Sequence, residues 1–446
     1  MFAIKRFLVL LLLGLSGLWL LSDAVYLDAL PENFFAWRNL LMQWSGVLAI
    51  GLMSVAVLLA VRPVSVEPWF GGLDKMYRLH KWLGIAALIV SVFHWLLAKA
   101  PKWLVGWGLL ERPRRGPRPE IPDGEWLRQF LSGQRGLAEE IGEWAFYAAA
   151  LLIALALIKR FPYRWFFKTH RLIAVAFIAL LWHSLVLLKF ETWTRLQGPA
   201  LALLMVAAGI AALRVLLRRV ARERQVVGEV ESVEHLENLK VLALTVRLQG
   251  EWPGHQAGQF AFLTLHEDEG PHPYTITSAW LDDGRISFAI KGLGDYTRSL
   301  PARTQVGDMV RIEGPYGRFN FQGQAPRQIW IGAGIGITPF IARLRALAEA
   351  RDGKTIDLIH STVDYDEAVM ERLRSDAVAA GVGLHILWDQ RDGRLDATRL
   401  MQMLPQWREA EFWFCGPAGF GKCLREALTQ AGLPAERFHQ ELFEMR

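Results

Sequence analysis

The chain has 446 residues, of which 52% are hydrophobic, and its mean hydropathy of +0.20 favours a membrane part joined to polar domains over a purely soluble protein. Its net charge of +6 gives no support to nucleic-acid binding, because the basic residues lie at the ends of apolar segments instead of forming one face or tail. Only two cysteines occur, Cys415 and Cys423, which excludes a disulfide framework, an Fe–S cluster and a cysteine-based zinc site.

Six apolar segments have lengths close to the roughly 20 residues that an α-helix needs to cross about 30 Å of hydrocarbon. They cover residues 5–24, 39–61, 79–99, 141–158, 171–189 and 199–217. The first segment has a cleaved signal peptide as its alternative, because Lys5 and Arg6 precede a short apolar core. The pattern predicts an all-α transmembrane bundle in residues 1–220, surrounded by membrane lipid.

Basic residues mark one side of these segments, and the positive-inside rule predicts that this side is cytoplasmic. Lys5, Arg62, Lys159 and Arg214 are examples, whereas the loop at 100–140 carries basic residues on the other side. With six spans, both termini and everything after residue 217 are expected in the cytoplasm. The expected location is a bacterial-type inner (plasma) membrane.

The composition changes after residue 220. Residues 221–325 contain short alternating segments separated by Gly, Pro and Asp, which predict an antiparallel β-barrel domain. Residues 326–446 alternate strand-like and helix-like segments, which predict a doubly wound α/β domain with a parallel sheet. The expected fold is therefore a multidomain membrane protein with three parts.

Four histidines lie inside the apolar segments, where ionisable side chains are costly and are candidates for function. His80 and His94 are fourteen residues apart in the third segment, and His170 and His183 are thirteen apart at the start of and within the fifth. Both segments run in the same direction, so His80 is expected at the depth of His170, and His94 at that of His183. The two levels would lie about 20 Å apart along the helix axis.

Two imidazoles facing each other are the axial ligands of a six-coordinate haem, and two levels predict two haems. Structural histidines held by a neighbouring helix are the alternative. Fourteen residues nearly return to the same face of a helix, but thirteen leave the side chains about 140° apart, so the fifth segment needs a bulge, a kink or tilted haem planes.

Glycine-containing motifs follow in the second half. HPYTITS (272–278) ends a predicted strand, and KGLGDYT (291–297) offers backbone N–H groups and a hydroxyl to a diphosphate. GAGIGITPF (332–340) follows a strand and opens a helix, with Thr338 expected as its N-cap and Pro339 as its first residue. These features predict a dinucleotide site at the helix N-terminus, with an ordinary tight turn as the alternative.

Together the paired histidines and the ordered motifs HPYT, GDYT, GPYG, GAGIGITP and FCGP resemble the ferric reductase and NADPH oxidase superfamily. The second half alone resembles the ferredoxin–NADP⁺ reductase fold. The resemblance implies a transmembrane oxidoreductase that passes electrons from cytoplasmic NAD(P)H through FAD and two b-type haems to an acceptor on the opposite face. A ferric chelate and O₂ are the two candidate acceptors, and a conduit to a periplasmic or membrane partner protein is the alternative.

The resemblance also implies roles for individual residues. Metal ligation falls to His80, His94, His170 and His183. FAD contacts fall to His272, Pro273, Tyr274, Thr275, Gly294 and Thr297, with Tyr274 and Thr275 beside the flavin ring. NAD(P)H contacts fall to Gly332, Gly334, Gly336, Thr338, Pro339, Cys415, Gly416 and Pro417, with Cys415 at the nicotinamide. Phe443, in the tail ELFEMR, is expected to cover the flavin.

Coenzyme choice depends on the stretch HSTVDYDEA (360–368). Relatives that prefer NADPH carry an arginine where this chain has Val363 and Asp364, and an acidic residue suits a ribose hydroxyl better than a phosphate. Ser361, Thr362, Arg391 or Arg394 remain able to accept a phosphate. The sequence therefore favours NADH.

Overall fold

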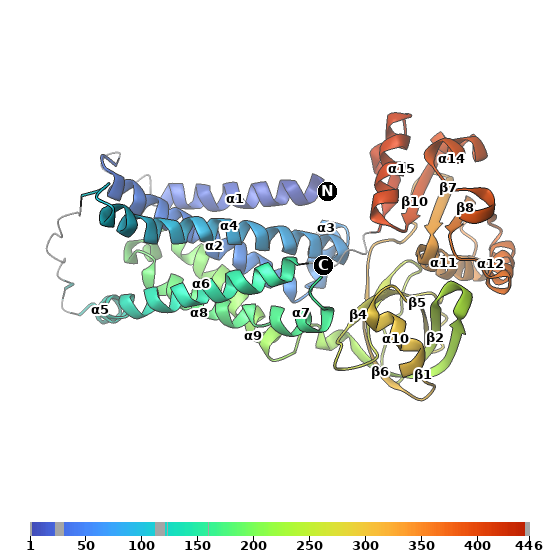
Figure 1. Ribbon diagram of the computed structural model, residues 1–446, viewed down its shortest axis with the longest axis horizontal. Coiled ribbons are helices and arrows are strands. Elements are labelled where there is room, and N and C mark those ends of the chain that lie inside the picture. The colour runs from blue at the N-terminus through green and yellow to red at the C-terminus, as the bar shows by residue number, and fades with distance from the viewer. Residues whose placement is uncertain (1, 23–30, 112–120, 123, 159, 442–446) are drawn as a thin grey trace. The chain divides into compact units, whose positions relative to one another are not determined.

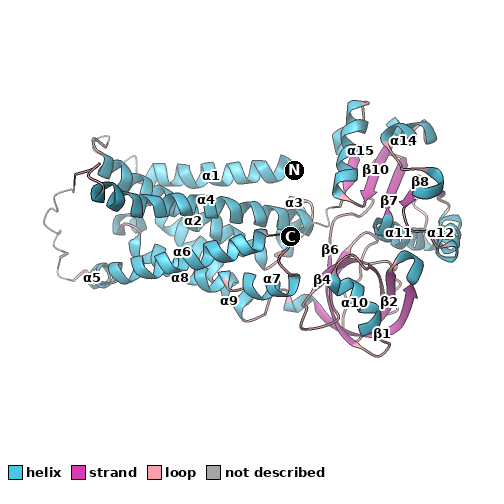
Figure 2. Ribbon diagram, viewed as in Figure 1, coloured by secondary structure: helices cyan, strands magenta, loops and turns pink. Residues whose placement is uncertain are grey.

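The computed structural model describes residues 2–22, 31–111, 121–122, 124–158 and 160–441. The chain forms two compact units. The first comprises Met1–Phe70 and Lys75–Val220, and the second comprises Gly71–Asp74 and the described residues from Ala221 onward. Among these residues, helices make up the first unit and all strands lie in the second (Figure 1, Figure 2).

Six helices of the first unit are long and apolar enough to cross a membrane, so the chain is a multi-pass membrane protein. The fifth span is made of two helices, α7 and α8. The bounds are α1 Phe2–Ser22, α2 Phe34–Ala60, α4 Leu73–Gly106, α6 Arg135–Leu157, α7 Tyr163–His170, α8 Ile173–Leu187 and α9 Gln197–Leu216. Short helices α3 (Glu67–Phe70) and α5 (Trp126–Gly133) and the 3₁₀ turn η3 (Phe190–Thr194) lie between the spans.

The predicted spans are found, but several helices are longer than their apolar cores. The third continues through Pro101 to Gly106, because a single proline removes only one backbone hydrogen bond. The second begins at Phe34, where the side chain of Asn33 accepts a hydrogen bond from the N–H of Ala36 at 2.9 Å. Residues 23–24 of the first predicted span lie outside the described residues.

The first part of the second unit is an antiparallel sheet with the strand order β4-β3-β6-β1-β2-β5. An isolated bridge between Ile276, just beyond β4, and Phe288 of β5 joins the two outer strands, so the sheet closes as the predicted barrel. The elements are β1 Gln225–Leu236, β2 Val241–Leu248, β3 Phe260–Thr264, β4 His272–Thr275, β5 Arg285–Lys291, α10 Asp295–Arg303 and β6 Met309–Tyr316.

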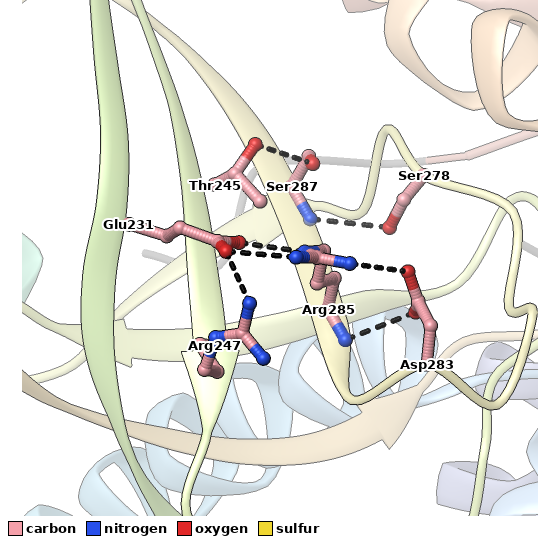
Figure 3. A network of polar contacts seen from close by, with 7 residues as sticks. All are labelled: Glu231, Thr245, Arg247, Ser278, Asp283, Arg285 and Ser287. Carbon is pink, nitrogen blue, oxygen red and sulfur yellow. Dashed lines mark hydrogen bonds and ion pairs between the residues drawn. The ribbon is translucent and has the colours of Figure 1, made fainter.

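A polar network stabilises the outer surface of this barrel (Figure 3). The register of β1 against β2 shifts between Val230 and Ser232, which makes Glu231 the extra residue of a β-bulge. Its carboxylate accepts hydrogen bonds from Arg285 at 2.7 and 2.9 Å and from Arg247. These guanidinium groups, Arg285 first, lower the pKa of Glu231 to about 2. The network thus joins three neighbouring strands.

The remainder of the second unit is a parallel sheet with the order β11-β10-β7-β8-β9 and helices on both faces, as predicted. Its central strands are almost entirely buried, which explains their continuous apolar sequences. Helices α11 and α12 pack in one core cluster, and α14 and α15 pack in another. The bounds are β7 Arg327–Ala333, α11 Thr338–Glu349, β8 Thr355–Thr362, α12 Glu367–Ala380, β9 Gly383–Trp388, α13 Asp389–Asp392, α14 Ala397–Met403, β10 Ala410–Cys415, α15 Ala418–Gln430 and β11 Phe438–Gln440.

Candidate functional site

The four membrane histidines form two pairs. The ring centres of His80 and His170 lie 5.9 Å apart with an interplanar angle of 71°, and those of His94 and His183 lie 6.3 Å apart at 80°. Each pair joins α4 to the α7–α8 span, as the predicted depths require. The sequence therefore brings the right partners together.

The separation within each pair fits two axial ligands of one metal ion. An imidazole nitrogen binds a first-row metal at about 2 Å, so two rings on opposite sides of the ion have centres about 6 Å apart. Among the described residues, no group of three or more His, Cys, Asp or Glu side chains is placed to hold a metal ion. A pair of this kind suits a metal whose other ligands come from a macrocycle, as in haem.

Hydrogen bonds at Nδ1 orient three of the four rings. His80 Nδ1 lies 2.8 Å from the carbonyl oxygen of Ala56, and His183 Nδ1 lies 2.8 Å from that of Ala138. His94 Nδ1 lies 3.0 Å from Ser45 Oγ, which itself donates to the carbonyl oxygen of Met42 at 3.2 Å. In each case Nδ1 is the donor, so Nε2 is the ring nitrogen available to a metal, which is the usual arrangement of ligating histidines.

His170 is held differently. Its Nδ1 is buried without a hydrogen-bond partner among the described residues, and its ring stacks on Phe166 at 5.0 Å and 25°. The pair of His80 and His170 therefore has one ring fixed by a hydrogen bond and one fixed by aromatic packing.

An interruption in the fifth span resolves the thirteen-residue spacing. Helix α7 ends at His170, Arg171 and Leu172 form a turn, and α8 begins at Ile173. Around this turn the N–H of Leu172 bonds to Thr169 and the N–H of Val175 to Leu172, both three residues back. A turn of this tighter type rotates the chain by about 120° per residue instead of about 100°. The extra rotation brings His170 and His183 closer to one face of the span.

Two glycines make room for the rings of His94 and His183, and the sequence motifs did not identify them. A Cβ on Gly142 of α6 would lie 1.9 Å from Nδ1 of His183, so the ring occupies the place of a side chain. A Cβ on Gly46 of α2 would touch the ring of His94 at 3.4 Å. The small-residue positions on neighbouring helices were the available signal for this close packing.

The predicted FAD residues gather at one end of the barrel. His272, Pro273, Tyr274 and Thr275 make up β4, and Thr275 is 6% exposed. Helix α10 begins after Gly294, and a Cβ on Gly294 would meet no atom within 4 Å. The open space beside a helix N-terminus fits a diphosphate, because the first N–H groups of a helix have no intrahelical acceptor.

Thr297 has a structural function in this loop. Its hydroxyl oxygen accepts hydrogen bonds from the N–H of Gly294 at 2.9 Å and from that of Leu293 at 3.0 Å. The side chain thereby fixes the turn that precedes α10. Any contact it makes with FAD is additional to this one.

His272 is packed between two tyrosines. Its ring lies 4.7 Å from that of Tyr296 and is nearly parallel to that of Tyr274, at 14° and 6.3 Å. Its Nδ1 lies 3.1 Å from the carbonyl oxygen of Gly270. Burial lowers the pKa of His272, so the ring is neutral in this environment. Tyr296, whose hydroxyl lies 3.0 Å from His266 Nδ1, is a site residue that the motif did not single out.

The predicted coenzyme residues meet at the carboxyl edge of the parallel sheet, where β7 and β10 are neighbours. Gly334 has φ +56° and open space where a Cβ would be. A Cβ on Gly336 would lie 2.2 Å from the carbonyl oxygen of Cys415, so glycine is needed there for the two loops to approach. Gly332 is the penultimate residue of β7, Gly416 follows β10, and Pro417 precedes α15.

The expected cap of α11 was wrong in detail. A 3₁₀ turn, η6 (Gly334–Ile337), precedes the helix. Thr338 is the first residue of α11 and not the N-cap of that helix. The hydroxyl of Thr338 donates to the carbonyl oxygen of Ile335 at 3.1 Å, and Pro339 occupies the first turn. Because the glycines form this tight turn, α11 begins at Thr338, one residue earlier than the motif predicted.

Cys415 is completely buried at the end of β10, and burial, together with the nearby carboxylate of Glu441, raises the pKa of its thiol. Glu441 is itself 5% exposed, and its carboxylate approaches Gly317 of the GPYG motif. Glu441 therefore lies near Cys415, a predicted coenzyme residue, although no role was predicted for Glu441 from the sequence. Phe443 lies outside the described residues.

Asp364 lies two residues after β8, next to the coenzyme loops in the sheet order. Its carboxylate is not isolated, because Lys291 Nζ, at the end of β5 in the barrel, lies 2.6 Å from it. Arg391 pairs with Asp392 at 3.0 Å, and Arg394 lies 3.6 Å from Asp389. The basic residues expected to accept a phosphate therefore each have an acidic neighbour.

Known proteins resemble both halves of the chain. Residues 45–181 match the family described as ferric reductase like transmembrane component, and residues 228–321 match the oxidoreductase FAD-binding domain. An NADPH oxidoreductase of Mycobacterium tuberculosis is 32% identical over 200 residues, which are 42% of this chain and 52% of that protein. A flavohemoprotein of Deinococcus radiodurans is 29% identical over 225 residues, which are 44% and 53%. The chain spans about half the length of these curated relatives.

A solved structure, the flavohem-like FAD/NAD-binding domain of nitric oxide dioxygenase from Vibrio cholerae, matches 48% of this chain and 97% of its own, with 22% identity and a TM-score of 0.43. The first family match includes His80, His94 and His170 and ends two residues before His183, and the second includes the barrel strands from Gly228 onward and α10. The chain thus joins a stretch that matches the ferric reductase like transmembrane component to a stretch that matches the oxidoreductase FAD-binding domain.

Proposed function

We propose that this protein is a transmembrane oxidoreductase that takes electrons from NAD(P)H on the cytoplasmic side and delivers them, by way of FAD and two b-type haems, to an acceptor on the opposite face. The main observation behind this proposal is that four membrane histidines form two pairs, with ring centres 5.9 and 6.3 Å apart. The same chain also contains an FAD-binding module. When bound, FAD supplies the change from hydride to single-electron transfer, and the haems supply one-electron carriage.

The membrane helices contribute ligands and fix their orientation. His80 with His170, and His94 with His183, would hold one haem each. The carbonyl groups of Ala56 and Ala138 and the hydroxyl of Ser45 hold Nδ1 of three rings, which leaves Nε2 of those rings to bind the metal. Because two histidines would hold each haem, neither metal would offer a free position to an acceptor, and bound haem would supply electron transfer without binding the acceptor.

The second unit contributes binding and shielding. Tyr274 and Thr275 on β4 would lie beside the flavin, while Gly294 and the first turn of α10 would receive the FAD diphosphate. The glycine loops after β7 and β10 would hold NAD(P)H, with Cys415 and Glu441 near the reacting rings. A buried thiol next to a buried carboxylate provides a site from which bulk water is excluded.

The acceptor is proposed to be a ferric chelate or O₂. Cations near the expected outer face, such as Arg38 and Lys99, could attract an anionic acceptor, but Lys99 pairs with Glu143 at 2.6 Å, and Arg38 donates a hydrogen bond to the carbonyl oxygen of Leu97 at 2.9 Å. Because of these contacts, the two cations would attract an anionic ferric chelate less strongly. O₂, a neutral acceptor, is therefore equally well supported. The alternative is a conduit that reduces a periplasmic or membrane partner protein.

The experiment uses the full chain, purified in detergent and loaded with haem and FAD, under anaerobic conditions. Addition of NADH or NADPH is expected to bleach the flavin and then to produce the spectrum of reduced b-type haem. Admission of a ferric chelate or of air then identifies the acceptor by reoxidation. A protein that binds no haem contradicts the proposal.

His94→Ala provides the internal control. It is expected to remove the outer haem while NAD(P)H still reduces the flavin, because the flavin and coenzyme residues belong to the second unit. Loss of haem together with loss of flavin reduction shows instead that His94 holds the fold.

A further inference from the structure

Asp364 occupies the position at which a parallel nucleotide-binding sheet reads the adenosine ribose. It follows β8, the strand next to β7 and its GAGIG loop, and an acidic residue in such a place accepts a hydrogen bond from the ribose 2′-hydroxyl. A carboxylate alone at this position would favour NADH and repel the 2′-phosphate of NADPH. The structure shows that it is not alone.

Lys291 reaches this position from the other domain of the second unit. It ends β5 of the barrel, and its Nζ lies 2.6 Å from Asp364 Oδ2. The side chains are 19% and 24% exposed, so the pair is partly shielded from water while part of each group stays accessible to a ligand. An ion pair in such a place is less screened than one on an open surface.

We propose that Lys291 and Asp364 together select the coenzyme by its 2′ substituent. Asp364 accepts a hydrogen bond from the 2′-hydroxyl of NADH, and Lys291 holds the carboxylate in place and balances its charge. Binding of a 2′-phosphate is therefore disfavoured but not excluded. This inference rests on the proposed function, since it assumes that NAD(P)H is the donor.

The two residues have opposite effects on a phosphate. Without Lys291, the carboxylate of Asp364 is uncompensated and repels a 2′-phosphate, while a neutral hydroxyl can still donate to it. Without the carboxylate, the ammonium group of Lys291 is released and attracts a phosphate as a point charge. The neighbouring guanidinium groups of Arg391 and Arg394 each have an aspartate beside them, so they do not override this balance.

A simpler role for the pair is to hold the two domains together. A second ion pair joins the same two domains without involving Lys291 or Asp364, since Arg372 of α12 bonds Glu234 of β1 at 2.7 and 3.0 Å. Arg372→Gln is therefore the matched control, because it breaks a contact between the same two domains.

The experiment measures the binding of NAD⁺ and NADP⁺ to the full-length, FAD-loaded protein by calorimetric titration, so that it does not depend on hydride transfer. Lys291→Gln is expected to weaken NADP⁺ about tenfold more than NAD⁺, and Asp364→Asn to shift the ratio of the two dissociation constants about tenfold in the opposite direction. Lys291→Arg is expected to keep the wild-type ratio, as is Arg372→Gln.

Equal changes for both coenzymes in Lys291→Gln and Asp364→Asn, or shifts in the same direction, overturn the inference and leave the pair as a domain contact. Failure of the wild-type protein to bind either coenzyme overturns it as well. The proposed function is judged separately, by whether NADH or NADPH bleaches the flavin. If the variants show the predicted shifts in binding but neither coenzyme bleaches the flavin, coenzyme selection by Lys291 and Asp364 is supported. The role of NAD(P)H as the electron donor is then refuted.

Discussion

The membrane half and the flavin half of this chain build their candidate sites from different parts of the polypeptide. In the membrane half, four imidazoles project from helices and meet in pairs. In the flavin half, the site is mostly backbone, namely glycine loops at strand ends and the first turns of α10 and α11. One half is therefore sensitive to which side chain is present, and the other to whether a side chain is present at all.

Glycine is the residue at which the two halves can be compared directly. In the bundle, Gly142 makes room for the ring of His183, whereas in the α/β domain Gly336 makes room for the backbone of Cys415. The added methyl group of alanine is the same in both places, but the displaced group differs. The predictions below use this contrast, starting with the largest effect.

Gly142→Ala is expected to remove about half of the bound haem, because a Cβ 1.9 Å from His183 Nδ1 displaces one ligand of the outer pair. Haem content is measured from the absorbance of its pyridine complex. Gly136→Ala, in the same helix and with no atom within 4 Å of its Cβ, is the control and is expected to retain full haem. Full haem in both variants would show that His183 is not a ligand.

Gly336→Ala is expected to slow flavin reduction by NAD(P)H about a hundredfold, because its Cβ would lie 2.2 Å from the Cys415 carbonyl oxygen and would push apart the two loops that position the coenzyme. Stopped-flow absorbance measures the rate, and haem content should not change. Gly419→Ala in α15, where the Cβ meets nothing within 4 Å, is expected to react at the wild-type rate. Equal rates in the two variants would place the coenzyme elsewhere.

The last prediction concerns pH and affects stability, not cofactor binding. His360 of β8 is buried with Nδ1 3.1 Å from the carbonyl oxygen of Gly332, and burial lowers its pKa to about 4. Because the folded protein favours the neutral ring, its contribution is complete above the usual value of 6.5 and is lost as pH falls from there through 4. A shift of this size corresponds to at most about 3 kcal/mol.

Hydrogen exchange of β8 between pH 7 and 4 measures this contribution, and His360→Gln is expected to flatten the pH dependence. The same slope in the variant would assign the acid sensitivity to another group. No comparable experiment applies to the glycine loops, which carry no titratable side chain.

Much of this architecture could be predicted from the sequence. Six apolar segments, period-two strands and strand–helix alternation each depend on local pattern, and each appears as expected. The partners within each histidine pair also followed, because helix rise fixes depth. Long-range packing was less accessible. Nothing near His183 in the sequence points to Gly142, and nothing near Asp364 points to Lys291, because both contacts depend on how distant elements meet.

The exact ends of the helices could not be predicted from the sequence pattern either. Thr338 looked like an N-cap because Pro339 follows it, yet the preceding glycines form a 3₁₀ turn that shifts the start of α11. Glu441 was visible only as part of a tail pattern, and its position near Cys415 required the tertiary structure.

The turn at Arg171 and Leu172 has a consequence for recognising such chains. Because it separates α7 from α8, the distance between the two histidines of that span is not tied to the repeat of one continuous helix. A search that demanded the same spacing in both ligand helices would reject this sequence. A rule that tolerates one residue of slack, provided that a helix break lies between the histidines, would retain it and would point to the break as well.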